Sequence, residues 1–322
     1  MSRRDFLPMT GFKMPMRDRV RVLPLLVAIV AALAGAAPAG AVTVGIADNK
    51  PDMFSDPRFV EARVATARLS VGWDALSSGW QLARLDAWLG AARAAGVEPL
   101  VSFGHSPIHR HRLPTVAQYM AAFRRFHARY PWVRDFATWN EANHCGEMTC
   151  HRPRLVASWF RRLRVACRGC RVLAAEVLDM PNMVGWVRSF KRAAREEPRY
   201  WGLHNYVDAN RGHTSGTRRL LGAVKGEVWF TETGGIVSRT NRRKITFPES
   251  AQHAAVATRF LFRRLVPLSR RITRVYIYQW NITRRKTTWD SALIGPNGRP
   301  RPAYAVVRAV LRKQAGARPA LG

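Results

Sequence analysis

The sequence predicts a single (β/α)8 barrel, the TIM-barrel fold of the α/β class, over residues 42–322. Three observations lead to this prediction. Eight apolar runs of strand length occur along these residues, and most are followed by a segment with the spacing of an amphipathic helix. The chain of 322 residues is long enough for one such barrel. No linker or low-complexity tract interrupts the alternation, so the strands are expected to form one parallel sheet.

Each expected strand is a short apolar run that ends at a polar or turn residue. The expected strands cover residues 42–46, 68–74, 97–105, 136–141, 172–176, 200–206, 228–232 and 275–280. Such runs are typical of parallel strands that are buried on both faces. No glycine-rich phosphate-binding loop follows any of them, so we expect neither a nucleotide nor any other cofactor.

The expected helices carry apolar residues three and four positions apart. They cover the segments around residues 82–92, 116–130, 153–166, 184–190, 248–265 and 303–314. Gly96 and Pro131 are stop signals after the first two of these helices. Pro153 begins the third at the first helical position, where proline is favoured.

Residues 1–41 are expected to be an export signal rather than part of the barrel. Basic residues precede an apolar run, and a small-residue cleavage site ends at Ala41. The opening residues 2–7 resemble a twin-arginine signal, although a start at Met14 or Met16 would remove them. We therefore expect a secreted or cell-envelope protein that is monomeric and has no stable membrane insertion after cleavage. The alternative is an uncleaved membrane anchor, but the apolar run is short for a membrane span.

The chain is strongly basic. It has 53 Lys and Arg residues against 21 Asp and Glu, a net charge of +32. Charge alone would suggest a nucleic-acid-binding protein, but export and the lack of a known binding motif count against that function, so we expect no nucleic-acid partner. Basic residues recur in the loops after the third, seventh and eighth expected strands. They are Arg110, Arg112, Arg239, Arg242, Arg243, Lys244, Arg284, Arg285 and Lys286.

These loops are expected to lie at the mouth of the barrel, the end at which the strands' carboxyl termini meet. An electropositive mouth would favour an anionic glycan or an acidic envelope polymer. The competing explanation is an arginine-rich composition throughout the chain. Arginines on helices, such as Arg161, Arg162 and Arg164, are expected to be a solvated face.

The four cysteines are expected to form disulfides, because disulfides are common in exported proteins. The helix 153–166 separates Cys145 and Cys150 from Cys167 and Cys170, and it is roughly 20 Å long. That length exceeds the reach of a disulfide, so each cysteine is paired with its near neighbour. The alternative is a zinc site formed by His144, Cys145, Cys150 and His151.

Two expected strands end in similar sequences that each contain a glutamate. Residues 138–143 read TWNEAN and include Glu141, and residues 228–234 read VWFTETG and include Glu232. The mouth of a (β/α)8 barrel is where its catalytic residues lie. Two carboxylates on opposite sides of a sugar are what glycosidic bond cleavage requires.

On these residues, the chain resembles the clan A retaining glycoside hydrolases, in the broad manner of families 5 and 39. The family pattern of Asn-Glu after the fourth strand and Glu after the seventh is similar to Asn140-Glu141 and Glu232. The segment 204–206, which reads His-Asn-Tyr, is similar to the His-x-Tyr of the family's sixth strand. Trp280 is similar to the Trp that ends the family's eighth strand, and Arg68 is similar to its second-strand Arg. Here Asn-Glu-Ala-Asn replaces the commoner Asn-Glu-Pro.

The resemblance implies a reaction with net retention. Glu141 would be the general acid/base, with a raised pKa, and Glu232 the nucleophile, with the two about 5 Å apart. Arg68 and Tyr206 would hydrogen-bond Glu232. The implied substrate contacts are Asn140 to the 2-hydroxyl, His204 beside Glu141, Trp280 as the floor for the sugar, and His105 and Trp73 as further contacts. The substrate would be a polysaccharide or oligosaccharide. The alternative is a catalytically silent barrel that binds polysaccharide or cell wall.

Overall fold

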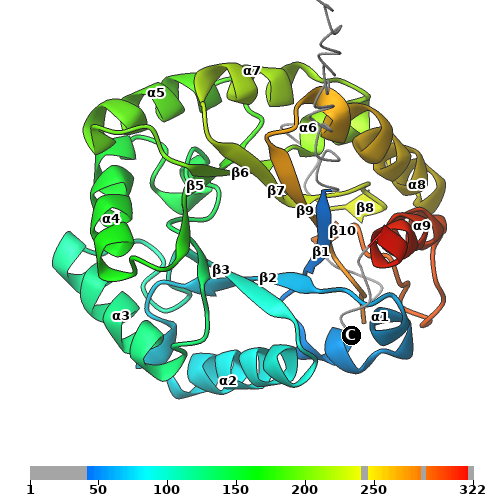
Figure 1. The fold of residues 1–322 in the computed structure, drawn as a ribbon, viewed down its shortest axis with the longest axis horizontal. Coiled ribbons are helices and arrows are strands. Elements are labelled where there is room, and N and C mark those ends of the chain that lie inside the picture. The colour runs from blue at the N-terminus through cyan, green and yellow to red at the C-terminus, as the bar shows by residue number, and fades with distance from the viewer. Residues whose placement is uncertain (1–41, 241–245, 284–287, 318–322) are drawn as a thin grey trace, which may run out of the picture. The chain divides into compact units, whose positions relative to one another are not determined.

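The computed structural model describes residues 42–240, 246–283 and 288–317. The residues of the expected export signal and its cleavage site lie outside this part of the chain. Eight parallel strands form the closed barrel predicted from the sequence, in the order β1-β2-β3-β4-β5-β6-β7-β9 (Figure 1). They are β1 (Thr43–Ala47), β2 (Thr66–Gly72), β3 (Glu98–Gly104), β4 (Asp135–Ala137), β5 (Arg171–Leu178), β6 (Tyr200–His204), β7 (Glu227–Thr233) and β9 (Ile272–Tyr278).

The helices surround this barrel (Figure 1). The longer ones are α2 (Gly79–Ala94), α3 (Val116–Arg129), α4 (Pro153–Ala166), α5 (Met183–Ala194), α7 (Ser215–Ala223), α8 (Ala251–Phe260) and α9 (Pro302–Ala317), and the shorter ones are α1 (Pro57–Glu61) and α6 (Tyr206–Arg211). Outside the barrel, β8 (Ser238–Arg239) pairs antiparallel with β10 (Trp289–Asp290). Within the described residues, no helix combines the length and apolar character needed to span a membrane.

Local sequence signals explain where several helices begin. Thr115 caps α3 through a reciprocal capping box with Gln118, which satisfies backbone groups that the first turn leaves free. Pro153 is at the start of α4, and the Ser250 side chain accepts a hydrogen bond from the backbone N–H of His253 in α8.

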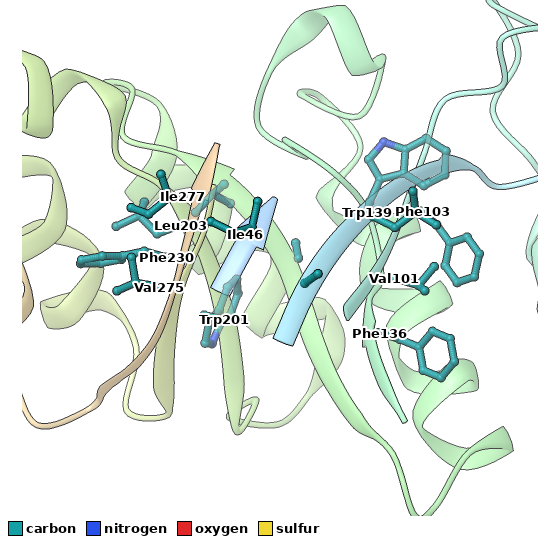
Figure 2. Close-up of a cluster of buried hydrophobic side chains, with 14 of the residues drawn as sticks. Ile46, Val101, Phe103, Phe136, Trp139, Trp201, Leu203, Phe230, Val275 and Ile277 are labelled. Atoms are coloured by element: carbon teal, nitrogen blue, oxygen red, sulfur yellow. The ribbon is translucent and has the colours of Figure 1, made fainter. Parts of the chain in front are cut away.

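The core has two layers, because alternate residues of each strand point to opposite faces. One layer lies between strands and helices and includes Val101, Phe136 and Val275 (Figure 2). The other fills the barrel and includes the neighbouring residues Leu100 and Ala137. Its remaining members are Ala47, Leu173, Tyr200, Trp229 and Tyr276. The barrel is therefore packed below its mouth, and chemistry is confined to the strand ends.

Bulges in β5 and β7 change which residues face into the barrel. Between Leu173 and Glu176, β5 has one residue more than the matching stretch of β6. The strand β7 has one extra residue between Trp229 and Glu232 when compared with β6. Without these bulges, residues three positions apart would point to opposite faces. With them, Glu176 and Glu232 both point inward, as Leu173 and Trp229 do.

Several expected strand ends were wrong, and three of them affect Glu141, Tyr206 and Trp280. The strand β4 stops at Ala137, so Glu141 follows in a turn with a left-handed φ of 42°. The strand β6 stops at His204, and Tyr206 begins α6. The strand β9 stops at Tyr278, so Trp280 lies beyond the barrel wall. In each case the apolar pattern continues past the point where the regular backbone pairing stops.

Both expected disulfides are formed. Cys145 pairs with Cys150 across a Cα–Cα distance of 4.8 Å, and Cys167 pairs with Cys170 across 5.4 Å. The alternative zinc site needs the thiolates of Cys145 and Cys150, and these sulfurs are bonded to each other. That alternative is therefore wrong for the oxidised protein.

Candidate active site

A buried ion pair forms the base of the candidate site. The Arg68 guanidinium of β2 donates from Nε to Glu176 Oε1 at 2.8 Å and from Nη2 to Glu176 Oε2 at 2.6 Å. The Ser102 hydroxyl of β3 also donates to Glu176. Although burial alone would favour a neutral carboxyl, Arg68 holds the pKa of Glu176 far below its usual range. This pair fixes the orientation of the guanidinium.

The same guanidinium holds two residues of the mouth. Its Nη1 donates to Glu232 Oε2 at 2.8 Å, and its Nη2 donates to Asn140 Oδ1 at 2.7 Å. The Tyr206 hydroxyl donates to Glu232 Oε1 at 3.1 Å. Glu232 thus has both oxygens engaged by donors, and its side chain is 16% exposed. Such charge-assisted contacts fix the orientation of the side chain and leave it accessible from the mouth.

Glu141 lies opposite Glu232 across the mouth. Its Oε1 is 3.2 Å from His204 Nδ1, and its side chain is 24% exposed. One oxygen of Glu141, one oxygen of Glu232 and a ring nitrogen of His204 all lie within 4.8 Å of one another. This carboxylate spacing falls in the range of retaining glycosidases, about 5 Å, and well below that of inverting ones.

The charges of Glu141 and His204 are coupled. Burial would raise the pKa of Glu141, but the hydrogen bond and charge of His204, with smaller effects of His144 and Arg68, lower it below its usual value. Burial would lower the pKa of His204, whereas the charge of Glu232 and the contacts with Glu141 and Glu176 raise it to about 9. The pair therefore carries one proton at neutral pH, and in the free site that proton is on His204.

This result corrects the expectation of a raised pKa for Glu141. The expectation considered the negative charge of Glu232, and it placed His204 beside Glu141 without allowing for the positive charge of its imidazolium. Because His204 has no exposed surface, its ring is screened little by water and acts strongly on the carboxylate 3.2 Å away.

The group of Glu141, His204 and Glu232 could also reach a metal ion, since one atom from each lies within 4.8 Å of the others. However, Arg68 and Tyr206 already occupy both oxygens of Glu232. A cation would compete with a guanidinium at this carboxylate, so the donor set suits proton transfer and nucleophilic attack better than metal binding.

His105 and Trp73, the two further sugar contacts expected from the sequence, differ in exposure. His105 follows β3 and is exposed, and its Nδ1 is 2.9 Å from both carboxylate oxygens of Glu147. The contact with Glu147 raises the pKa of His105, although its partial burial opposes this effect. Trp73 is half-buried at the end of β2 and packs against the main core. A sugar contact by either residue stays a prediction.

Trp280 does not line the mouth. Its ring has no exposed surface, packs edge-on against Phe59 and Tyr304, and donates from Nε1 to Asp56 at 3.0 Å. The proposed role as a floor for the sugar is therefore wrong in this arrangement. On the same strand, burial raises the pKa of Tyr278, and the charges of Glu232 and Glu141 raise it further.

Three of the nine basic residues expected at the mouth lie in the described part of the chain. Arg239 is buried and pairs with Glu249 at 3.2 Å, and its guanidinium lies over the Phe247 ring at 4.5 Å. Arg110 and Arg112 are exposed in the loop after β3. The other basic residues expected there, at positions 242–244 and 284–286, lie outside the described residues.

Two residues of the site were missed by sequence reasoning. Glu176 is the last residue of the fifth expected strand but was given no role, and Glu147 was not considered. A usable signal did exist for Glu176. An arginine inside an apolar strand needs a buried carboxylate, and Glu176 ends another apolar run, that of the fifth expected strand.

Comparisons with known proteins give the fold. No model of a protein family matches the sequence, and no curated protein matches it. Among solved structures, the chain is similar to xylanase 10B of Thermotoga maritima, with 11% identity, a TM-score of 0.59, and coverage of 86% of this chain and 97% of that one. It is similar to fungal β-1,4-galactanases, with 13% identity, a TM-score of 0.62, and coverage of 83% and 99%.

A third similar structure is the GH5_18 protein of Streptomyces cattleya in complex with GlcNAc. The identity is 17%, the TM-score is 0.60, and the match covers 87% of this chain and 82% of that one. At these identities the similarity establishes a shared barrel architecture. The assignment of chemistry therefore depends on the geometry of the site itself.

Proposed function

We propose that this protein is a retaining glycoside hydrolase, with Glu232 as nucleophile and Glu141 as general acid/base. The observation that carries the proposal is the carboxylate spacing of at most 4.8 Å between their nearest oxygens at the mouth of the barrel. The different surroundings of the two residues support the division of roles. Glu232 is held by Arg68 and Tyr206, whereas Glu141 is next to a proton on His204.

In the first step, a carboxylate oxygen of Glu232 attacks the anomeric carbon and forms a glycosyl ester. The bond from that carbon to the leaving oxygen breaks, and the leaving oxygen takes a proton from Glu141. His204 supplies this proton to Glu141 across their 3.2 Å contact. Neutralising Glu232 in the ester removes one of the charges that raise the pKa of His204, which favours this transfer.

In the second step, Glu141 acts as a base. It takes a proton from water while the water oxygen attacks the anomeric carbon, and the ester bond to Glu232 breaks. Two inversions at the same carbon give net retention. Asn140 has its Oδ1 fixed by Arg68, which leaves its side-chain N–H₂ as a donor for a hydroxyl of the reacting sugar.

The proposed substrate is an oligosaccharide or polysaccharide. Similar structures include xylanase 10B of Thermotoga petrophila in complex with xylobiose and a GH5_18 variant of Bifidobacterium longum in complex with Manb1-4GlcNAc. An anionic glycan is one proposed substrate, and a screen of polysaccharides would identify the sugar that this chain recognises. Export to the cell envelope or beyond, and a monomeric state, are also part of the proposal.

The test combines a substrate screen with two variants. Glu232→Ala should abolish turnover, and added azide should restore it by forming a glycosyl azide of inverted configuration. Glu141→Ala should spare aryl glycosides that have good leaving groups and should lose activity on natural linkages. Full activity of either variant on a natural glycan would refute the assignment. Binding of a glycan with no turnover by the wild-type protein would instead support the catalytically silent alternative.

A further inference from the structure

A groove between α4 and α5 is lined by unusually many arginines. It has a volume of about 830 Å³, and its positive side chains are Arg152, Arg154, Arg161, Arg192 and Arg195, with His151 at one end. The two helices lie side by side at the outside of the barrel (Figure 1), and they pack against each other through Phe160 and Phe190. The volume is within the range of ligand pockets, about 300–1,000 Å³.

Within the described residues, no carboxylate partner is found for these arginines. No Asp or Glu lines the groove, and in the described part of the chain none of the five arginines forms an ion pair with an acidic residue. The nearest acidic residues in sequence are engaged elsewhere, since Glu196 pairs with Arg164 and Glu197 with Lys191. The groove therefore holds several positive charges that repel one another and that an anion would stabilise.

Composition alone does not account for this cluster. Arginine is 46 of 322 residues, about one in seven, whereas five of the ten groove-lining residues are arginines. A second arginine-rich pocket, of about 420 Å³, contains Arg171 together with Glu98 and Asp135. There Arg171 pairs with Asp135 at 2.6 Å and with Glu98 at 3.4 Å. Arg171 in that pocket is thus neutralised by two carboxylates, whereas no ion pair with an acidic residue is found for the groove arginines within the described residues.

The backbone contributes differently at the two helix ends that line the groove. The helix α4 begins at Pro153, so its N-terminal end, with free backbone N–H groups and the positive end of the helix dipole, lies among Arg152 and Arg154. The helix α5 contributes its C-terminal end, where the dipole is negative, and Arg195 caps that end with a φ of 57°, a left-handed conformation that favours glycine. An arginine in that position costs about 1 kcal/mol relative to glycine.

We propose that this groove binds a chain of an acidic polysaccharide, separately from the catalytic mouth. Its concave shape fits a single polymer chain better than a flat bilayer. No aromatic side chain lines it, so it lacks the stacking platforms with which proteins hold single-stranded nucleic acid. His151 follows Cys150 directly, so one end of the groove borders the disulfide loop that begins after Glu141. A bound polymer would hold the barrel on an acidic matrix while the mouth acts on a glycan nearby.

The experiment measures binding of the full chain to polygalacturonate and to the same polymer with its carboxylates fully methyl-esterified. The variant Arg161→Gln/Arg192→Gln removes one charge from each wall of the groove. The matched control, Arg124→Gln/Arg125→Gln, removes two exposed charges from α3. We expect the groove variant to bind polygalacturonate about tenfold more weakly, as expected for two lost charge contacts. The control should bind as the wild type does, and the esterified polymer should bind weakly to all three proteins.

Equal losses in the two variants would overturn the proposal, because binding would then follow net charge alone. Equal binding of the esterified polymer would overturn it as well. Binding of a single-stranded DNA of equal charge at least as tightly as polygalacturonate, with the same loss in the groove variant, would reassign the groove to nucleic acid. Hydrolysis of an aryl glycoside by both variants reports on the mouth, so failure of the groove proposal is distinguishable from failure of the proposed catalytic function.

Discussion

Arg68 and Glu176 form a bidentate ion pair inside the barrel, with Nε–Oε1 at 2.8 Å and Nη2–Oε2 at 2.6 Å. The side chains are 2% and 0% exposed. Because the remaining Arg68 donor contacts Glu232, this pair links the packed interior to the mouth. A rigid fork of donors is a property of arginine that lysine lacks.

The substitution Arg68→Lys should therefore be strongly disruptive. A lysine cannot satisfy both oxygens of Glu176 and also reach Glu232, and it would leave a buried carboxylate partly unpaired. We expect the free energy of unfolding to fall by about 3–5 kcal/mol, measured by denaturant titration. The matched control is Arg58→Lys, at a more exposed pair with Asp56, where the loss should be below about 1 kcal/mol. Equal losses at the two sites would contradict the assigned role of Arg68.

The Glu141–His204 pair predicts the alkaline limit of activity. His204 has its pKa raised to about 9, so the proton needed by the leaving group should be lost as pH rises through that value. In His204→Gln the cation is absent, and Glu141 alone must hold the proton. The alkaline limb of kcat/KM should then move to lower pH, because a glutamate loses its proton at lower pH than the His204 imidazolium does. A limb that stays near pH 9 in the variant would show that His204 is not the proton's source.

The same pair predicts how stability changes with pH. The folded-state pKa of His204 is raised above its usual value of 6.5, so its contribution is fully present below about pH 6.5 and is lost as pH rises through about 9. The Tm of the wild type should fall relative to that of His204→Gln across this window. Thermal scans at several pH values would check this, and parallel curves for the two proteins would contradict it.

Gly202 is expected to be required beside the bulge of β5. A Cβ at this position would lie 2.6 Å from Glu176 Cγ and 2.8 Å from Thr231 Oγ1, distances that real Cβ contacts do not show. Gly202→Ala should thus displace Glu176 and cost about 1–3 kcal/mol of unfolding free energy. Gly222→Ala in α7 is the control, because a Cβ there meets nothing within 4 Å. It should stabilise the protein by about 0.5–1 kcal/mol, and the same sign for both substitutions would contradict this argument.

The bulges also mark the limit of what the sequence could predict. Apolar runs and helical spacing were sufficient for eight strands and the barrel, because both are periodic signals. Strict alternation from Trp229, which fills the barrel, would point Glu232 outward. An extra residue in β7 turns it inward, and no period-two pattern contains that information. Chemical reasoning about paired carboxylates identified Glu232 without the bulge, but could not have given its orientation.

For Trp280, in contrast, the sequence pattern led to a wrong prediction of where the side chain lies. An aromatic residue at the end of an apolar run was expected to face the mouth, yet the strand stops at Tyr278 and the Trp280 ring packs among Phe59 and Tyr304. Both positions satisfy the same sequence pattern. The choice between them depends on where backbone pairing ends and on a partner for the indole, Asp56, that is 224 positions away in the chain.

The two disulfides should differ in their effect on the site. Both close very short loops, so removing either should cost a similar amount of stability, about 2 kcal/mol in the chain-entropy description. The Cys145–Cys150 loop contains Glu147, whose carboxylate contacts His105 at the mouth, whereas Cys167–Cys170 lies at the end of α4. In Cys145→Ser/Cys150→Ser, the raised pKa of His105 should therefore fall toward its usual value as the Glu147 contact loosens. An NMR titration of His105 measures this change, with Cys167→Ser/Cys170→Ser as the control. A His105 titration that both variants leave unaltered would mean that the loop keeps its conformation without its disulfide.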